Sequence, residues 1–521
     1  MRPWVWRPPL ELSPAEQRVA KRVRRAKLFV FLRQWRSELF SEAFQEELAT
    51  MYRESAKGHP PVPPAQLALA TVLQAYTGVS DDEVIEALTM DRRWQLALDC
   101  LDSEEPPFSK GTLVAFRQRL IEQGLDRRLI ERTVELAAQH GGFGSRQLRA
   151  ALDSSPLWGA SRVEDTYNLL GHALRKALGV IARQQGRGLA EMSVEAGTPI
   201  LGGASLKAAL DLNWDDPAER QQGLGKVLQA LRGVEQWLRE RPEGDNDPGA
   251  RESLAIAHQV RDQDVDTDTQ GQPLLRQGVA KDRRITVEDA EMHHGRKSRS
   301  QRVDGYKRHV LRDLDSGLVP AVGVTSANVP EASVTESITM DLDAQGLTLQ
   351  EVHIDRAYLS STLVRDRTAE MQIYCKAWPV HNGNRFPKTA FQLDWDQGRI
   401  RCPGDVDMPF LPGGVVHFPA EQCQICEKRQ QCTASSHGRS VSIHPDERLL
   451  CELRQRQHTA AGRAKLRERV AVEHGLAHIG RWQGRRARYR GTRKNLFDLR
   501  RTAVVHNLHV ISHLPDMAMP A

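Results

Sequence analysis

Apolar residues recur at helical spacing from the start of the chain to about residue 135. Ser13–Glu16 has the sequence of a capping box with Pro at the first helical position, and Ser80–Glu83 is a second capping box. Between them, the Pro-rich break at Pro60–Pro64 precedes a helix that Gly78 ends. These signals predict a compact, all-helical unit over residues 1–140.

A further helix is expected after Ser109, with Leu113, Phe116 and Leu120 on its buried face. This spacing places Arg117 and Arg119 on the exposed side. A helical unit with basic faces is a candidate DNA-binding domain, and a simple packing or dimerisation domain is the alternative.

The pattern changes to strands after the glycine-rich turn at Gly141–Gly144. Leu148–Asp153 is a short extended segment that ends in an acid. The next strand candidates, Tyr306–Arg312 and Leu318–Thr325, flank a turn with Gly near its end and predict a hairpin. A helix is expected over residues 330–344, and the strands that follow it are Glu351–Asp355, which again ends in Asp, and Met371–Lys376.

The order of these elements predicts an α/β fold with a ribonuclease-H-like mixed sheet as its catalytic core. Residues 145–160 and 285–380 would form the first part of this core. Residues 446–515 would add a helix with an acid, within a long basic helix at about Thr459–Trp482, and a basic C-terminal segment.

A large helical insertion is predicted over residues 161–284. Its apolar stripes are Leu170, Leu174, Leu178 and Ile181, and then Leu224, Val227, Leu231, Val234 and Leu238. The second stripe, Leu224–Leu238, is a candidate assembly surface, and a helical pair packed on the catalytic core is the alternative.

Three carboxylates stand where such a fold can bring them together: Asp153, Asp355 and Glu473. Two Mg²⁺ ions about 3.5–4 Å apart can activate a water and stabilise a leaving oxyanion, and Mg²⁺ prefers carboxylate ligands. Each Asp can instead be an ordinary strand end or helix cap. Glu473 shares a mostly apolar stripe with Leu466, Val470 and Ala477, where a buried carboxylate needs a metal or an ion pair with Arg469 or His474.

Four of the seven cysteines are clustered within residues 381–445, at Cys402, Cys423, Cys426 and Cys432. Their spacing suits a tetrahedral Zn²⁺, with His417 or His437 as substitutes for one ligand. The region is irregular and Gly-rich, so we expect it not to fold easily on apolar burial alone, and structural zinc is favoured over unligated thiols. Cys100, Cys375 and Cys451 are expected to be buried without a role.

The chain has 521 residues, 40% of them hydrophobic, a formal net charge of +6 and no run of 18 apolar residues. The N-terminus is too polar for a signal peptide, so a cytoplasmic protein with no membrane association is expected. Basic residues crowd the segment Arg481–Arg501, while Asn213–Asp268 is acidic. Such separation can present a basic face to a polyanion, although charge alone favours a solvated surface.

Several motifs resemble those of DDE transposases of bacterial insertion sequences, specifically the insertion sequence 1182 group within the insertion-sequence-five assembly. Asp289–His309 resembles the segment before and within the second strand, and His353–Tyr358 resembles the second-Asp motif. Leu152–Leu157 is similar to the first-Asp motif. Arg467–Glu473 and Arg485–Gly491 look like the third-acid helix and the basic tail, and the resemblance covers nearly the whole chain.

The resemblance implies that Asp153, Asp355 and Glu473 bind two Mg²⁺ (or Mn²⁺) ions. Residues 474–478 depart from the family pattern by lacking a basic pair, which leaves Glu468 as a weaker rival for the third acid. Lys307, His309 and Arg356 are possible phosphate contacts or exposed strand residues. The expected DNA-binding residues are Arg117, Arg119, Lys297, Lys307, Arg481, Arg485, Arg486, Arg488, Arg490, Arg493 and Lys494.

The expected function is therefore a transposase that binds terminal inverted repeats, hydrolyses phosphodiester bonds and transfers the 3′-OH ends into target DNA. Double-stranded DNA is the expected partner, and a homodimer or higher assembly is expected because two ends must be joined together. The alternatives are a catalytically silent DNA-binding regulator derived from a transposase and a nuclease without strand transfer.

Overall fold

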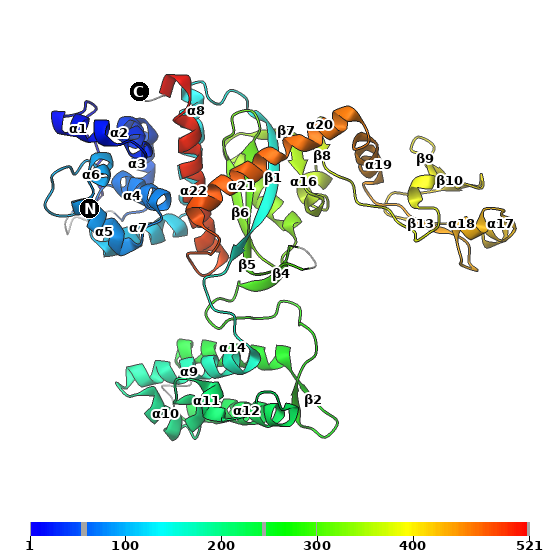
Figure 1. Cartoon of the computed structure of the whole chain (residues 1–521), viewed down its shortest axis with the longest axis horizontal. Helices are drawn as coiled ribbons and strands as arrows, with labels where there is room; N and C mark the ends of the chain where they lie inside the picture. The colour runs from blue at the N-terminus through cyan, green and yellow to red at the C-terminus, as the bar shows by residue number, and fades with distance from the viewer. Residues whose placement is uncertain (1, 54–59, 242–245, 298–299, 518–521) are drawn as a thin grey trace.

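A mixed six-stranded sheet lies at the centre of the molecule (Figure 1), which is described here from a computed structural model covering residues 2–53, 60–241, 246–297 and 300–517. The strand order is β4-β5-β1-β7-β8, and β6 also pairs with β5. The strands are β1 (Gln147–Trp158), β4 (His293–Arg296), β5 (Arg302–Asp313), β6 (Ala321–Ser326), β7 (Thr348–Ile354) and β8 (Gln372–Tyr374). This mixed α/β sheet agrees with the α/β fold class predicted from the sequence.

Side chains of β1 and β7 alternate between two covered faces of the sheet. On one face, Leu152 and Ile354 belong to a core completed by α15 (Thr335–Asp343), α16 (Thr362–Arg365) and α19 (Glu447–Arg456). On the other face, Ala151 and Val310 belong to a core that contains Val472 of α21 (Val470–Gln483) and residues of α22 (Thr492–Ile511). The two short turns η2 (Glu331–Val334) and η3 (Arg356–Tyr358) follow β6 and β7.

The described residues between Pro14 and Gln139 form helices without strands. Ser13 and Ser80 make the two predicted capping boxes. The helices are α1 (Pro14–Arg22), α2 (Leu28–Leu39), α3 (Glu42–Ala49), α4 (Pro64–Thr77), α5 (Asp81–Met90), α6 (Arg92–Leu98), α7 (Lys110–Glu122) and α8 (Asp126–Gln139). Their apolar core is continuous with that of α21 and α22, so α22 joins the N-terminal helices to the sheet.

The helical insertion forms a lobe of its own below the sheet in Figure 1. Its elements are α9 (Thr166–Gln184), α10 (Leu189–Glu195), η1 (Pro199–Leu201), α11 (Leu206–Leu210), α12 (Pro217–Arg239), α14 (Pro248–Asp264), β2 (Val265–Thr267) and β3 (Pro273–Leu275). The proposal of Leu224–Leu238 as an assembly surface is wrong. Both apolar stripes are buried against each other in the lobe's own core, because α9, α12 and α14 pack together.

The Cys-bearing region is a second peripheral lobe, at the right of Figure 1. It contains η4 (Lys388–Ala390), β9 (Gln392–Asp394), β10 (Arg399–Arg401), β11 (Asp407–Pro409), β12 (Val415–His417), α17 (Ala420–Ile425), α18 (Arg429–Cys432) and β13 (Ser440–Ser442). The expectation of little apolar burial needs correction, because Phe391, Ile400, Phe418 and Val441 are among the residues of a small core there.

Two further expectations differ from the structure. The helix predicted over Thr459–Trp482 is broken at Arg469 into α20 (Ala460–Glu468) and α21. Cys451 is half-buried and accepts a hydrogen bond from Arg454, whereas Cys100 and Cys375 are buried as expected. None of the described helices is long and apolar enough to cross a membrane.

Candidate active site

Asp153 and Asp355 lie side by side at the end of the parallel pairing between β1 and β7. Leu152 is paired with Ile354, so the next residue of each chain segment is a carboxylate at the same edge. The prediction that the first strand ends at Asp153 is wrong, because β1 stays paired with β5 as far as Trp158. Asp153 is therefore held in the middle of a strand, at the point where β7 leaves it.

Backbone amides help to fix both carboxylates. The Ser154 N–H donates to Asp153 Oδ1 at 2.8 Å, and the Arg356 N–H donates to the Asp355 side chain, which caps η3. Asp355 is exposed, whereas the Asp153 side chain is only 14% exposed. One carboxylate is thus enclosed and the other faces solvent.

The two aspartates share a cleft of about 610 Å³ with basic side chains. Its other lining residues are Ser154, Ser155, Pro156, Arg296, Lys297, Val303, Lys307, Ala327, Pro330, Glu331, Arg356 and Ala357. Acids and cations lining one cleft are the two kinds of group that a metal-assisted reaction on a phosphodiester needs.

Burial raises the pKa of Asp153 above its usual value, and the nearby Asp355 and Glu331 raise it further, while Arg469 opposes the rise. Burial also lowers the pKa of Lys307, an effect that Glu331 opposes from 3.9 Å. Carboxylates that repel one another in a partly enclosed cleft gain stability from a cation between them. The donor set therefore fits a hard divalent metal ion such as Mg²⁺.

Glu473 reaches this region from α21, but not in the way its sequence pattern predicts. Its side chain is 51% exposed, and the buried face of α21 instead carries Val472, Leu476 and Ile479. The apolar stripe through Leu466 does not exist, because the helix breaks before α21 begins. Glu473 therefore stands at the solvent side of the helix.

Arg469 connects Glu473 to the first aspartate. Its guanidinium donates to Asp153 Oδ2 and, at 3.1 Å, to Glu473 Oε1. This ion pair is the alternative that the sequence offered for Glu473. It also places the third predicted acid one arginine away from Asp153, so that Asp153 and Glu473 share one positive charge.

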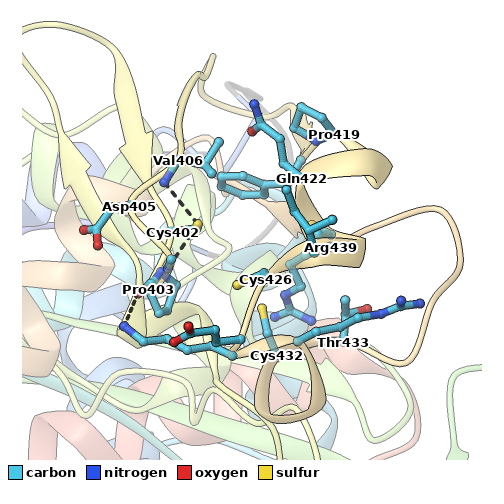
Figure 2. A pocket seen from close by; sticks show the side chains of 17 residues that line it. Cys402, Pro403, Asp405, Val406, Pro419, Gln422, Cys426, Cys432, Thr433 and Arg439 are labelled. Atoms are coloured by element: carbon cyan, nitrogen blue, oxygen red, sulfur yellow. Dashed lines mark hydrogen bonds between the residues drawn. The ribbon is translucent and has the colours of Figure 1, made fainter.

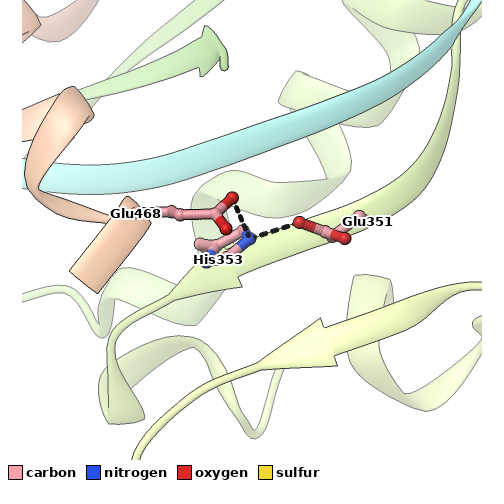
Figure 3. A group of neighbouring side chains, drawn as sticks. All are labelled: Glu351, His353 and Glu468. Atoms are coloured by element: carbon pink, nitrogen blue, oxygen red, sulfur yellow. Dashed lines mark hydrogen bonds and ion pairs between the residues drawn. The ribbon is translucent and has the colours of Figure 1, made fainter. Parts of the chain in front are cut away.

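Glu468, the rival third acid, lies elsewhere, beside Glu351 and His353 (Figure 3). Ligand atoms of these three residues lie within 4.8 Å of one another, which makes them a possible metal site. Arg149 and Lys465 already bind both carboxylates, however, so the charge of the group is balanced without an ion. We interpret it as an ion-pair network that fastens α20 to β1 and β7.

The residues expected to contact phosphate divide into two groups. Lys297, Lys307 and Arg356 line the cleft, as a phosphate contact requires. His309 does not, because it is fully buried between Tyr358 Oη and Thr325 Oγ1, at 2.8 and 3.0 Å, and burial lowers its pKa to about 3.

The predicted exposure of Arg117 is also wrong. The side chain is buried and donates to both oxygens of Asp81 and to Gln74, because α7 packs against α5 and α4. Arg119 is half-buried, with its guanidinium 4.8 Å from the ring centroid of Tyr52.

Much of the basic C-terminal segment holds the protein together. Arg486 donates to the carbonyls of Gly159 and Ala160, and Arg488 donates to that of Val79. Arg490 pairs with Glu288, and Arg493 pairs with Asp126. Arg481, Arg485 and Lys494 are exposed and make no side-chain hydrogen bond or ion pair with any residue that the structure describes, so the DNA contacts expected of these three stay a prediction.

Glu331 and Arg469 are the site residues that the sequence did not single out as active-site groups. Glu331 follows Pro330 at the start of a predicted helix, which is also where an ordinary capping acid stands. Arg469 was considered only as an ion-pair partner of Glu473. Its bond to Asp153 spans 316 residues of sequence, and no local signal encodes it.

The four clustered cysteines line one cavity of about 430 Å³ in the peripheral lobe (Figure 2). The N–H groups of Gly404 and Val406 donate to Cys402 Sγ at 3.3 and 3.4 Å. A Cβ at Gly404 would lie 2.9 Å from Cys426 Sγ, so the loop passes close to a second thiol. His417 and His437 are exposed outside this lining.

Two protein-family models match parts of the chain. A family model described as "Transposase DDE domain" matches residues 413–512, which include Glu473, and one described as "Transposase domain (DUF772)" matches residues 17–119. No curated protein and no solved structure matches the chain. The two family matches, one at each end of the chain, indicate a transposase function and support a DDE-type transposase family.

Proposed function

We propose that this chain is the transposase of an insertion sequence, of the insertion sequence 1182 group. It would cut and join double-stranded DNA with Asp153, Asp355 and Glu473 as its catalytic carboxylates. The observation that carries the proposal is the placement of Asp153 and Asp355 directly after the last parallel pair of β1 and β7, within a cleft that also holds Lys297, Lys307 and Arg356. A polar cleft lined by both acids and cations suits a phosphodiester.

Asp153 and Asp355 would hold the metal ions, and Glu473 would complete the ligand set from α21. Two bound Mg²⁺ (or Mn²⁺) ions would activate the attacking water or 3′-OH and stabilise the leaving oxyanion. Lys307 and Arg356 would bind the phosphate oxygens on either side of the cut. Arg469 is the present countercharge for Asp153 and Glu473, and it is free to turn to a DNA phosphate once the carboxylates hold cations.

The third acid can be assigned by comparing Glu473→Gln, Glu331→Gln and Glu468→Gln in a DNA-cleavage assay. We expect Glu473→Gln to slow cleavage about 100-fold or more, because a metal ligand contributes several kcal/mol to transition-state stabilisation. Glu331→Gln should cost less than about tenfold, since its role is to hold Lys307. Glu468→Gln should lower thermal stability with little effect on the cleavage rate. A larger loss for Glu331→Gln than for Glu473→Gln would transfer the ligand role to Glu331.

We also propose that Cys402, Cys423, Cys426 and Cys432 bind a structural Zn²⁺. Burial raises the pKa of the Cys432 thiol, Arg439 opposes this rise, and the other three cysteines add to it. A metal ion bound by the four cysteines would favour their thiolate forms. The N–H donors to Cys402 Sγ favour its thiolate form.

The zinc proposal predicts about one zinc per chain in purified protein, measured by elemental analysis. Cys423→Ser should abolish zinc binding and expose the lobe to protease, because a structural site needs all of its ligands. Cys375→Ser, which alters a buried cysteine outside the lobe, is the matched control and should retain zinc. Zinc-free wild-type protein with a folded lobe would refute this site.

Strand joining separates the proposed function from its alternatives. The wild-type chain is incubated in Mg²⁺ with linear DNA carrying the ends of its own element and with a supercoiled target plasmid. We expect products in which the 3′ ends are covalently joined to the target. Cleaved but unjoined DNA would favour a nuclease, and specific binding of the ends without cleavage would favour a DNA-binding regulator.

A further inference from the structure

An arginine pocket lies between α1 and α6, in the N-terminal helices and on the far side of α22 from the sheet (Figure 1). It is a cavity of about 310 Å³, and six of its nine lining residues are arginines: Arg18, Arg22, Arg24, Arg25, Arg92 and Arg93. The other lining residues are Val19, Val23 and Ala26. No acid lines it.

Carboxylates among the described residues balance only two of the six arginines in this pocket. Arg92 pairs with Asp102, and Arg93 pairs with Asp91. Arg18, Arg22, Arg24 and Arg25 are exposed, and none of them makes a side-chain hydrogen bond or ion pair with a described residue. Residues 18–27 contain six cations and no acid.

Local packing directs these charges to one place. Val19 is buried on α1, and Glu16 of the same helix forms a buried ion pair with Arg33 of α2. The only acid on α1 therefore points away from the pocket, and two arginines from α6, distant in sequence, close its other wall. A solvated run of charges would not need such a convergence of two segments.

We propose that this pocket binds backbone phosphates of duplex DNA. The guanidinium group presents paired N–H donors that match phosphate oxygens, and several guanidinium groups around one cavity gain most from a polyanion with regularly spaced phosphates. This inference rests on the proposed function, because it assumes that DNA is the substrate, and it assigns a contact outside the cleft. The phosphates held here belong to a segment of the duplex other than the one being cut.

The test is the salt dependence of DNA binding. A fluorescent 40-base-pair duplex of random sequence is titrated with wild-type chain and with the triple variant Arg18→Gln, Arg22→Gln and Arg25→Gln, from 0.05 to 0.3 M KCl. Each lost phosphate contact lowers the slope of log Kd against log salt by about 0.9, so we expect a decrease of about 2 to 3 and roughly 100-fold weaker binding at 0.1 M KCl.

The matched control removes three exposed arginines from the helical insertion, Arg183→Gln, Arg220→Gln and Arg232→Gln, with the same loss of net charge. We expect its slope to stay within about one of the wild-type slope. Equal slopes for wild type and the pocket variant, or an equal loss of DNA affinity in the pocket and control variants, would overturn the pocket assignment alone. Failure of the wild-type chain to bind any duplex would overturn the proposed function as well, and binding of phosphatidylglycerol vesicles in place of DNA would identify a membrane site instead.

Discussion

Asp153→Asn is expected to slow DNA cleavage at least about 10³-fold while leaving DNA affinity within a fewfold of the wild type. The substitution keeps the shape of the side chain but removes a charged metal ligand at the more enclosed of the two aspartates. A loss of about 4 kcal/mol of transition-state stabilisation corresponds to this factor. Cleavage of DNA carrying the element's ends measures the rate, and fluorescence anisotropy measures the affinity.

Asp366→Asn is the matched control for this substitution. Asp366 is exposed and pairs with the exposed Arg365, outside the cleft. Its replacement should leave the cleavage rate unchanged within about twofold, because exposed ion pairs contribute little. Cleavage by Asp153→Asn at a rate close to that of this control would remove Asp153 from the catalytic set.

Asp126→Asn is expected to loosen the junction between the N-terminal helices and α22 by about 3 kcal/mol. Asp126 is fully buried at the start of α8, and its carboxylate binds Arg493 and Arg500 of α22 at 2.6 and 3.2 Å. The substitution removes the only carboxylate partner of Arg493 among the described residues and leaves the buried Arg500 with Asp341 alone, and breaking a buried ion pair is costly. Hydrogen exchange followed by mass spectrometry should show about 100-fold faster exchange in peptides from α8 and α22.

The control for the junction is Asp315→Asn, which removes an exposed partner of Arg149. This change should alter exchange only slightly, since surface ion pairs are worth about 0 to 1 kcal/mol. Protection of α22 that is unchanged in Asp126→Asn would mean that apolar packing alone joins the two parts.

Local signals carried much of the architecture. The signals of a capping box, and of an extended apolar segment that precedes an acid, involve only residues that are close together in the sequence. Ser13, Ser80 and Asp355 therefore lie where their patterns predict. Asp153 and Asp355 were the most predictable residues of the site, because an acid after an extended apolar segment is visible in the sequence, although β1 continues beyond Asp153.

Contacts between distant segments explain what the sequence did not reveal. Arg117 looks exposed on its own helix, but its partner Asp81 stands on α5. The density of arginines in the C-terminal segment predicts a DNA-binding tail, but this segment leads into α22, whose Phe497, Val504 and Leu508 are buried. The helical spacing of these apolar residues is present in the sequence, but the neighbouring arginines favoured an exposed segment over a buried helix. The zinc site, the homodimer or higher assembly and the role of Glu473 as the third metal ligand stay predictions.

The most direct test of the central claim is metal-dependent cleavage at the paired aspartates. DNA carrying the element's own ends is incubated with wild type and with Asp355→Asn, in Mg²⁺ and in EDTA, and both strands are followed. We expect cleavage and joining by the wild type in Mg²⁺ only, and none by Asp355→Asn, although both proteins bind the ends. Cleavage that persists in Asp355→Asn, or an absence of cleavage by the wild type with any divalent metal despite specific end binding, would contradict this account.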